Sequence, residues 1–200
     1  MTTGFRDPDL LILEQLDDRS LLSLCSVDKY TNTLCKNEDF WNKRFIKTYG
    51  NYIKPTLTKW RELYLKVVYY LDGSTDWNIG MEFAAKKGDK DLVDFFISKG
   101  ANYWNKGMLC AVQGGHKDLV EFFISKGSDD WNWNWGMYGA AKRGHQDLVD
   151  FFISKGADNW NSGMYGAAKR GHQDLVDFFI SKGADNWNWG MVHPKKDIKN

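Results

Sequence analysis

Histidine, cysteine and carboxylate side chains are the groups of this 200-residue chain that could perform catalysis or hold a metal. Three histidines, His116, His145 and His172, each follow a glycine and are separated by 29 and 27 residues. A shared metal ion needs converging ligands, with cysteine or carboxylate partners at ligand spacing, and the wide separation favours a role at helix starts instead. The sequence therefore predicts no metal and no other cofactor.

The cysteines and acids also favour structural roles. Cys25, Cys35 and Cys110 are too few for a disulfide scaffold and have no C-x-x-C spacing, so we expect small buried side chains rather than reactive thiols. Pairs of acids three residues apart, such as Asp147 and Asp150, recur in near-identical copies, whereas catalytic acids need distinct environments. We interpret the acids as a solvated stripe, and the sequence predicts that the protein is not an enzyme.

An internal repeat is the main feature of the sequence. The string Trp-Asn-x-Gly-Met begins at Trp77 and recurs after steps of 27, 29, 27 and 27 residues. A second string, Asp/Glu-Phe-Phe-Ile-Ser-Lys-Gly, occurs once in each of the four complete units. Met137–Trp160 and Met164–Trp187 are identical at all 24 positions, which indicates recent duplication. An array of this period is typical of a solenoid.

Each unit is predicted to contain two helices. In the third unit, Met137, Ala140 and Ala141 share one face of a short helix, which Gly144 terminates. A second helix over about 145–155 has apolar side chains around roughly 200° of its circumference, which fits contact with its partner and both neighbouring repeats. We therefore predict an all-α solenoid of four short hairpins joined by tight Trp-Asn loops, with an incomplete fifth unit, over 76–200.

The hairpins resemble ankyrin repeats over about 76–188. Ala140-Ala141, Gly144-His145, Leu148-Val149 and Gly156-Ala157-Asp158 match the ankyrin pattern, and the fourth unit matches it again. Ankyrin repeats have roughly 33 residues, so the shorter units here lack the β-hairpin finger. The resemblance implies that the first helices line the concave face. The predicted target-binding residues are the outer side chains of these helices and two extra tryptophans: Glu82, Lys86, Leu109, Gln113, Trp131, Trp135, Tyr138, Lys142, Tyr165 and Lys169.

Residues 1–50 are predicted to form a three-helix unit, and 51–75 a helix that bridges to the first repeat and caps it. Pro8, the spacing Leu21-x-x-Leu24-x-x-Val27 and Asp39-Phe40-Trp41 follow in the order found in F-boxes, which this segment resembles. The resemblance implies docking to a Skp-type adaptor of a cullin–RING ubiquitin ligase. F-box-like segments joined to short ankyrin-like repeats are similar to proteins of large DNA viruses. The expected adaptor-binding residues are Pro8, Leu10, Leu13, Leu16, Leu21, Leu24, Val27 and Trp41.

Composition narrows the classes of function. The formal net charge is +1, so bulk charge argues against a nucleic-acid partner. Without a membrane-spanning apolar run or a recognisable secretory signal, we expect a cytoplasmic protein, in the host cytoplasm if it is viral. The sequence favours an adaptor that brings a target protein to a ubiquitin ligase. Two alternatives stay open: a purely structural or decoy repeat protein whose N-terminal unit serves only as a cap, and a nucleic-acid or glycan binder that uses its aromatic rows. The unfinished C-terminal repeat also leaves self-association open.

Overall fold

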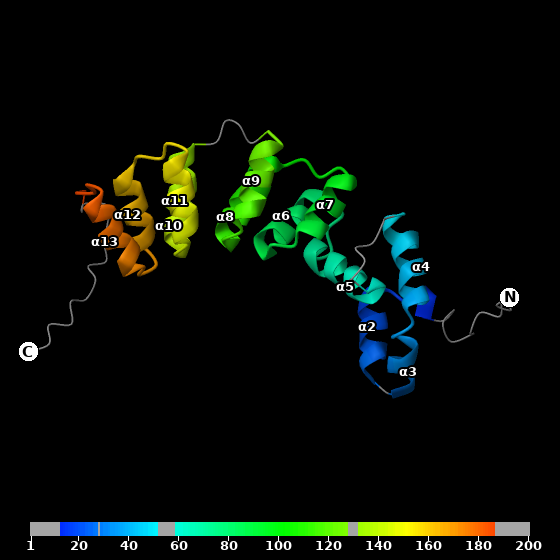
Figure 1. Ribbon diagram of the computed structural model, residues 1–200. Coiled ribbons are helices and arrows are strands. Elements are labelled where there is room, and N and C mark those ends of the chain that lie inside the picture. The colour runs from blue at the N-terminus through cyan, green and yellow to red at the C-terminus, as the bar shows by residue number, and fades with distance from the viewer. Residues whose placement is uncertain (1–12, 28, 52–58, 128–131, 187–200) are drawn as a thin grey trace, which may run out of the picture. The chain divides into compact units, whose positions relative to one another are not determined.

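The computed structural model describes residues 13–27, 29–51, 59–127 and 132–186, and the side chains of all of these except 27 and 29–31. The described residues form helices and no strand (Figure 1), which confirms the predicted all-α fold. The chain divides into two compact units, Met1–Gly73 and Ser74–Asn200, and each is described by itself below.

The described residues of the first unit form four helices and a helical segment at 13–15. The helices are α2 (Asp18–Val27), α3 (Lys29–Leu34), α4 (Glu38–Tyr49) and α5 (Trp60–Leu71). Helix α4 begins where the side chain of Asn37 accepts a hydrogen bond from the backbone N–H of Phe40, and it ends at Gly50. The indole of Trp41 is fully buried and donates a 2.7 Å hydrogen bond to the Cys35 carbonyl, which ties α4 to the end of α3.

Helix α5 coincides with the expected bridging segment and packs on α4. Its side chains Leu63, Tyr64 and Val67 are buried, and the rings of Tyr64 and Trp41 lie 5.4 Å apart. By these contacts α5 belongs to the first unit. Its role as a cap on the first repeat stays a prediction.

Two of the three cysteines form a disulfide, which the sequence interpretation did not foresee. Cys25 in α2 and Cys35 after α3 are bonded to each other, with their Cα atoms 5.8 Å apart. Both are buried, as expected, but as a cross-link rather than as separate small side chains. The two cysteines come together because the chain reverses direction between α2 and α3. A separation of 10 residues in the sequence does not by itself show that two Cα atoms lie within disulfide distance.

The second unit consists of four helical hairpins. They are α6 (Trp77–Lys87) with α7 (Lys90–Ser98), α8 (Trp104–Gly114) with α9 (Lys117–Ser125), α10 (Trp133–Arg143) with α11 (Gln146–Ser154), and α12 (Trp160–Ala168) with α13 (Gln173–Ser181). The first helices of the hairpins pack side by side in the order α6, α8, α10 and α12 (Figure 1). This arrangement confirms the predicted solenoid of short hairpins.

The Trp-Asn pairs lie in the first turn of each first helix, so the prediction of Trp-Asn loops is wrong. Helix α10 starts at Trp133 because the side chain of Asn132 accepts a hydrogen bond from the backbone N–H of Asn134. The side chain of Asn134 in turn accepts hydrogen bonds from the backbone N–H groups of Asp158 and Asn159, at 2.9 and 2.8 Å. The asparagine of the motif therefore holds the loop that leads into the next repeat.

The glycine of the Trp-Asn-x-Gly-Met string allows the two helices of a hairpin to approach closely. A Cβ atom on Gly136 would lie 2.5 Å from a ring carbon of Phe152, which is fully buried in α11. The ring of Trp133 packs against the same phenylalanine, with centroids 6.3 Å apart. Gly80, Gly107 and Gly163 meet a phenylalanine of their own hairpin in the same way. The tryptophans that start the four complete repeats are therefore half-buried packing residues.

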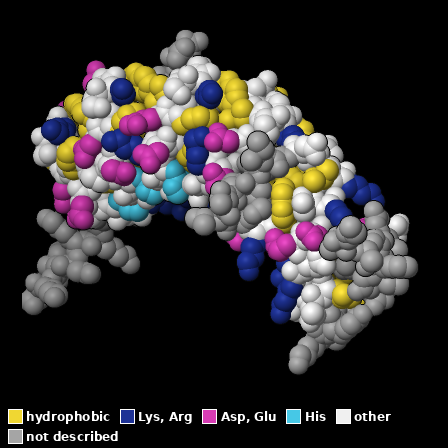
Figure 2. All heavy atoms as spheres, turned by 45° about the vertical axis from the view of Figure 1, so that its right-hand side comes forward, with side chains coloured by type: hydrophobic (Ala, Val, Ile, Leu, Met, Phe, Trp, Pro, Cys, Tyr) yellow, Lys and Arg dark blue, Asp and Glu magenta, His cyan; other side chains and the backbone are white. Residues whose placement is uncertain are grey.

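The histidines directly precede the second helices, which confirms the role predicted from their position. His116, His145 and His172 occupy the N-cap positions of α9, α11 and α13. Instead of capping their own helices, two of the rings face the preceding repeat: Nε2 lies 3.2 Å from the Lys86 carbonyl for His116 and 3.4 Å from the Gln113 carbonyl for His145. The histidine side chains form a row along one edge of the unit (Figure 2).

Candidate functional site

The predicted target-binding side chains occupy equivalent outer positions on the first helices, in pairs four residues apart. Each pair shares one side of its helix because such a spacing is close to one helical turn. Two of these apolar side chains are well exposed, Trp135 at 66% and Leu109 at 37%. Lys86 and Lys169 are also exposed, and the rest of the described members are half-buried.

Aromatic rings of two adjacent repeats form a continuous surface on this side. Tyr138 and Tyr165 stack with their centroids 6.1 Å apart and an interplanar angle of 18°. Trp135 lies edge-on to Tyr138 at 5.9 Å. Lys142 and Lys169 each place their ammonium over the tyrosine one turn earlier, at 5.9 and 5.6 Å from the ring centroid. These cation–π contacts hold positive charge against the aromatic surface.

A cavity of about 310 Å³ lies between α8 and α10 on this side. It brings together five of the predicted target-binding residues, Leu109, Gln113, Trp135, Tyr138 and Lys142. Asn132, Gly139 and Arg143 complete the lining. The cavity thus has an aromatic and aliphatic wall, amide groups and two cations, and no carboxylate is among these lining residues.

The remaining predicted residues lie elsewhere. Glu82 and Lys86 are on α6, in the first repeat, where Glu82 forms an ion pair of 3.9 Å with Lys106. Tyr165 and Lys169 belong to the fourth repeat, next to the cavity through the Tyr138–Tyr165 stack. Trp131 lies outside the described residues. Asn132 and Gly139 were not among the predicted residues, and the departure from the 27-residue period at Trp131-Asn132 is the sequence signal that could have pointed to them.

The balance of charge differs between the two helices of each repeat. Cations gather on the first helices and in the residues that follow them: Lys86, Lys87, Lys106, Lys142, Arg143, Lys169 and Arg170. Exposed acids gather on the second helices: Asp91, Asp94, Asp118, Glu121, Asp147, Asp150, Asp174 and Asp177. The first helices therefore carry an excess of positive charge, with Glu82 as the one acid in their described ranges. The second helices mix their acids with lysines that lie on them or directly after them: Lys90, Lys99, Lys117, Lys126, Lys155 and Lys182.

The predicted adaptor-binding residues are mostly inside the first unit. Leu13, Leu21 and Trp41 are at most 2% exposed, so they cannot contact a partner while the unit keeps this fold, and their direct role is corrected to a role in its core. Leu16 and Leu24 are half-buried and keep some accessible surface. Pro8, Leu10 and the side chain of Val27 lie outside the described part of the chain.

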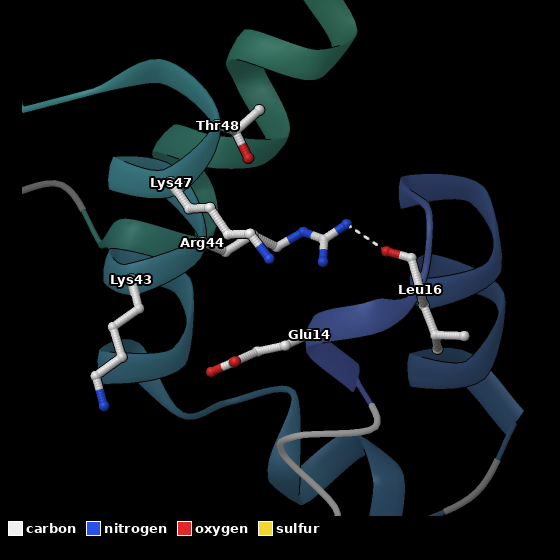
Figure 3. A pocket seen from close by; sticks show the side chains of 6 residues that line it. All are labelled: Glu14, Leu16, Lys43, Arg44, Lys47 and Thr48. Atoms are coloured by element: carbon white, nitrogen blue, oxygen red, sulfur yellow. Dashed lines mark hydrogen bonds between the residues drawn. The ribbon is translucent and has the colours of Figure 1, made fainter.

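A half-buried arginine connects the elements of the first unit. The guanidinium of Arg44 donates to the Leu16 carbonyl and to the Asp18 carboxylate, both at 2.7 Å, and to the hydroxyl of Tyr64 at 3.0 Å. Burial, together with the hydrogen bond that its hydroxyl donates to Asp18, raises the pKa of Tyr64. Arg44 also borders a cavity of about 510 Å³ with Lys43 and two further polar side chains of α4 (Figure 3). Since its donors are engaged by acceptors of the protein, Arg44 serves the fold.

The described residues offer few groups for catalysis. No cluster of three or more histidine, cysteine or acidic side chains in them could hold a metal ion. Burial raises the pKa of the half-buried Cys110 thiol to about 11, which keeps it protonated at neutral pH. Every helix of the described ranges is too short or too polar to cross a membrane.

The stacked hairpins define the class of this protein as an α-helical repeat protein. A family model described as ankyrin repeats (3 copies) matches residues 81–163 and 108–189, which together are more than half of the chain. The chain therefore belongs to the ankyrin-repeat family. No curated protein and no solved structure matches it. Ankyrin repeats are protein-interaction modules and are generally not enzymes, so the partners indicated for this chain are proteins.

Proposed function

We propose that this protein binds a target protein through the side of the repeats formed by its first helices. The observation that carries the proposal is the cavity between α8 and α10, where side chains of two repeats converge around the exposed Trp135. Aromatic and cationic side chains are enriched at the energetic centres of protein interfaces. The side formed by the second helices presents acids interspersed with lysines instead.

Site-specific photo-crosslinking tests which side binds. A photoreactive amino acid replaces Lys169 at the end of α12 or, as the matched control, Asp150 in α11, because both side chains are exposed. In cells that express the full chain, we expect a discrete crosslinked protein from Lys169 and none from Asp150. Crosslinks from Asp150 alone would contradict the proposal, and crosslinks only to a second copy of the chain would favour the structural, self-associating alternative.

A second proposal concerns the first unit: it docks to a Skp-type adaptor, so that the bound target is presented to a ubiquitin ligase. The helical fold of the described residues, with α2, α3 and α4, supports it. So does the accessible apolar surface of α2, where Leu22 is 36% exposed and Leu24 is half-buried. The mechanism is proximity, because a tethered target has a high effective concentration at the ligase. This role places the protein in the cytoplasm, or in the host cytoplasm if the protein is viral.

Binding of the purified full chain to a purified Skp-type adaptor tests the second proposal. Leu22→Glu should reduce binding strongly, whereas Ser23→Glu, an exposed neighbour on the same helix, serves as the matched control for added charge. Circular dichroism confirms that both variants keep their helices. If the wild-type chain does not bind the adaptor, the ligase role is refuted while the target-binding proposal for the repeats is unaffected.

A further inference from the structure

The second and third repeats are farther apart than the third and fourth. Gly139 and Gly166 occupy equivalent positions in two repeats that share a stretch of 24 identical residues. A Cβ atom on Gly166 would lie 2.7 Å from the backbone oxygen of Tyr138, on the preceding first helix. A Cβ atom on Gly139 would meet only Cγ1 of Val112, at 3.3 Å. The wider spacing of α8 and α10 therefore opens the cavity that Gly139 helps to line.

This spacing coincides with the one irregular step of the repeat. The second and third Trp-Asn-x-Gly-Met strings are 29 residues apart, where the other steps are 27. The additional residues are Trp131 and Asn132, and Asn132 both caps α10 and lines the cavity. The cavity is thus specific to this junction, although the repeats around it are nearly identical in sequence.

The size and walls of the cavity fit one large apolar side chain. Its volume of about 310 Å³ is at the lower end of the range of roughly 300–1,000 Å³ that binding pockets occupy. Trp135 forms one wall and is 66% exposed, whereas the equivalent positions of the other three complete repeats hold Ile79, Lys106 and Ser162. A tryptophan so exposed next to Leu109 and Tyr138 is apolar surface that a partner can cover.

The charges around the cavity select a partner of opposite sign. Lys142 and Arg143 are in its lining, and the neighbouring first helices add Lys86, Lys169 and Arg170. Glu82 is the one acid on the described first helices, and it is paired with Lys106. Opposite charges on two surfaces steer their association and suppress wrong partners.

We propose that the cavity between α8 and α10 takes a large apolar side chain from an acidic segment of the target protein, whose flanking carboxylates pair with Lys142 and Arg143. This inference rests on the proposed function and names the chemistry of the partner. Nucleic acid could also use aromatic and basic side chains. The eight exposed acids on the second helices and the net charge of +1 favour the peptide.

Selection of random peptides displayed on phage tests the proposal with the full chain as bait. We expect the enriched peptides to carry one Trp, Phe or Leu flanked by Asp and Glu. Trp135→Ala should weaken their binding by roughly tenfold or more, as for a central interface aromatic. Tyr69→Ala, which removes an aromatic side chain 63% exposed in the first unit, should leave binding unchanged.

Charge reversal provides the second arm of the test. Lys142→Glu combined with Arg143→Glu should abolish binding of the acidic peptides. Lys155→Glu, at the exposed end of the second helix of the same repeat, is the matched control and should retain it. Because salt screens exposed charges, raising the salt concentration from about 0.05 to about 0.5 M should also weaken binding.

Several results would overturn the inference. These are the absence of enriched peptides, enrichment of basic or purely polar ones, and equal binding by wild type and Trp135→Ala. Tighter binding of a single-stranded oligonucleotide, lost in Trp135→Ala, would assign the cavity to nucleic acid instead. If any of these occurs while the photo-crosslink from Lys169 persists, target binding by the first helices stands and only the acidic-segment chemistry is refuted.

Discussion

Replacement of Gly136 by alanine tests the close packing that holds Trp135 and the cavity in place. In an exposed helix interior, alanine is more favourable than glycine by about 1 kcal/mol. At Gly136 the added Cβ would lie 2.5 Å from a ring carbon of Phe152, whose side chain has no exposed surface. Overpacking a well-filled core costs about 1–3 kcal/mol. The clash therefore offsets or exceeds the gain in helix propensity.

Gly139→Ala in the same helix is the matched control. It gains the same helix propensity, but its Cβ would approach only one methyl group of Val112, at 3.3 Å. The difference between the two variants isolates the clash, so we expect Gly136→Ala to be less stable than Gly139→Ala by about 1–3 kcal/mol. Urea unfolding of the full chain, followed by circular dichroism, measures this difference in the free energy of unfolding.

A double-mutant cycle separates the clash from other effects. Phe152→Leu removes the ring that meets the new Cβ, so Gly136→Ala should cost less in the Phe152→Leu background than in the wild type. Equal or greater stability of Gly136→Ala compared with Gly139→Ala would refute the reasoning. The glycine of the repeated string would then have no packing role, and the positions of the first helices would need another explanation.

Three further predictions concern other parts of the chain. Asn134→Ala removes three hydrogen bonds between the third repeat and the loop that follows it and should lower the free energy of unfolding by at least about 1 kcal/mol, measured with urea. Cys25→Ser with Cys35→Ser opens a disulfide between residues 10 apart and should destabilise the first unit by about 2.5 kcal/mol, seen by calorimetry as a lower melting temperature for that unit alone. Burial raises the pKa of the Cys110 thiol from 9.0 to about 11, so this thiol ionises at a lower pH in the unfolded chain than in the folded one. The contribution of Cys110 to the free energy of unfolding should therefore be intact below pH 9 and decrease as the pH rises toward 11. The native thiol should accordingly react more slowly with a thiol reagent at pH 8 than the denatured one.

Local signals made the repeats predictable from the sequence. Apolar residues at helical spacing and glycines after the last helical turn gave both helices of each hairpin, and Gly144, at φ 80°, ends α10 as expected. The start of α10 was misjudged because Trp-Asn resembles a loop sequence. Its helical conformation depends on the cap from Asn132 and on the packing of Trp133 against Phe152.

Features that join distant residues were not predictable in the same way. The helical spacing placed Tyr138 and Lys142 on one side of α10, but it did not say how far α8 lies from that side. The distance follows from backbone approach at Gly139 and Gly166, which only coordinates reveal. Likewise, the residues of the disulfide and of the Arg44–Tyr64 hydrogen bond are brought together by the tertiary fold, and no local sequence pattern indicates that they are in contact.

The 24 identical residues shared by the last two complete repeats affect how the number of repeats can change during evolution. The regular junctions use the same contact, because the side chains of Asn78, Asn134 and Asn161 each accept a hydrogen bond from the backbone of the loop that ends their repeat. Unequal recombination between identical coding segments can therefore add or remove a whole hairpin without creating a mismatched junction. The number of repeats, and with it the length of the array, can therefore differ between related proteins. The junction at Trp131-Asn132 departs from the 27-residue period, so a repeat inserted or removed there would not reproduce the same interface.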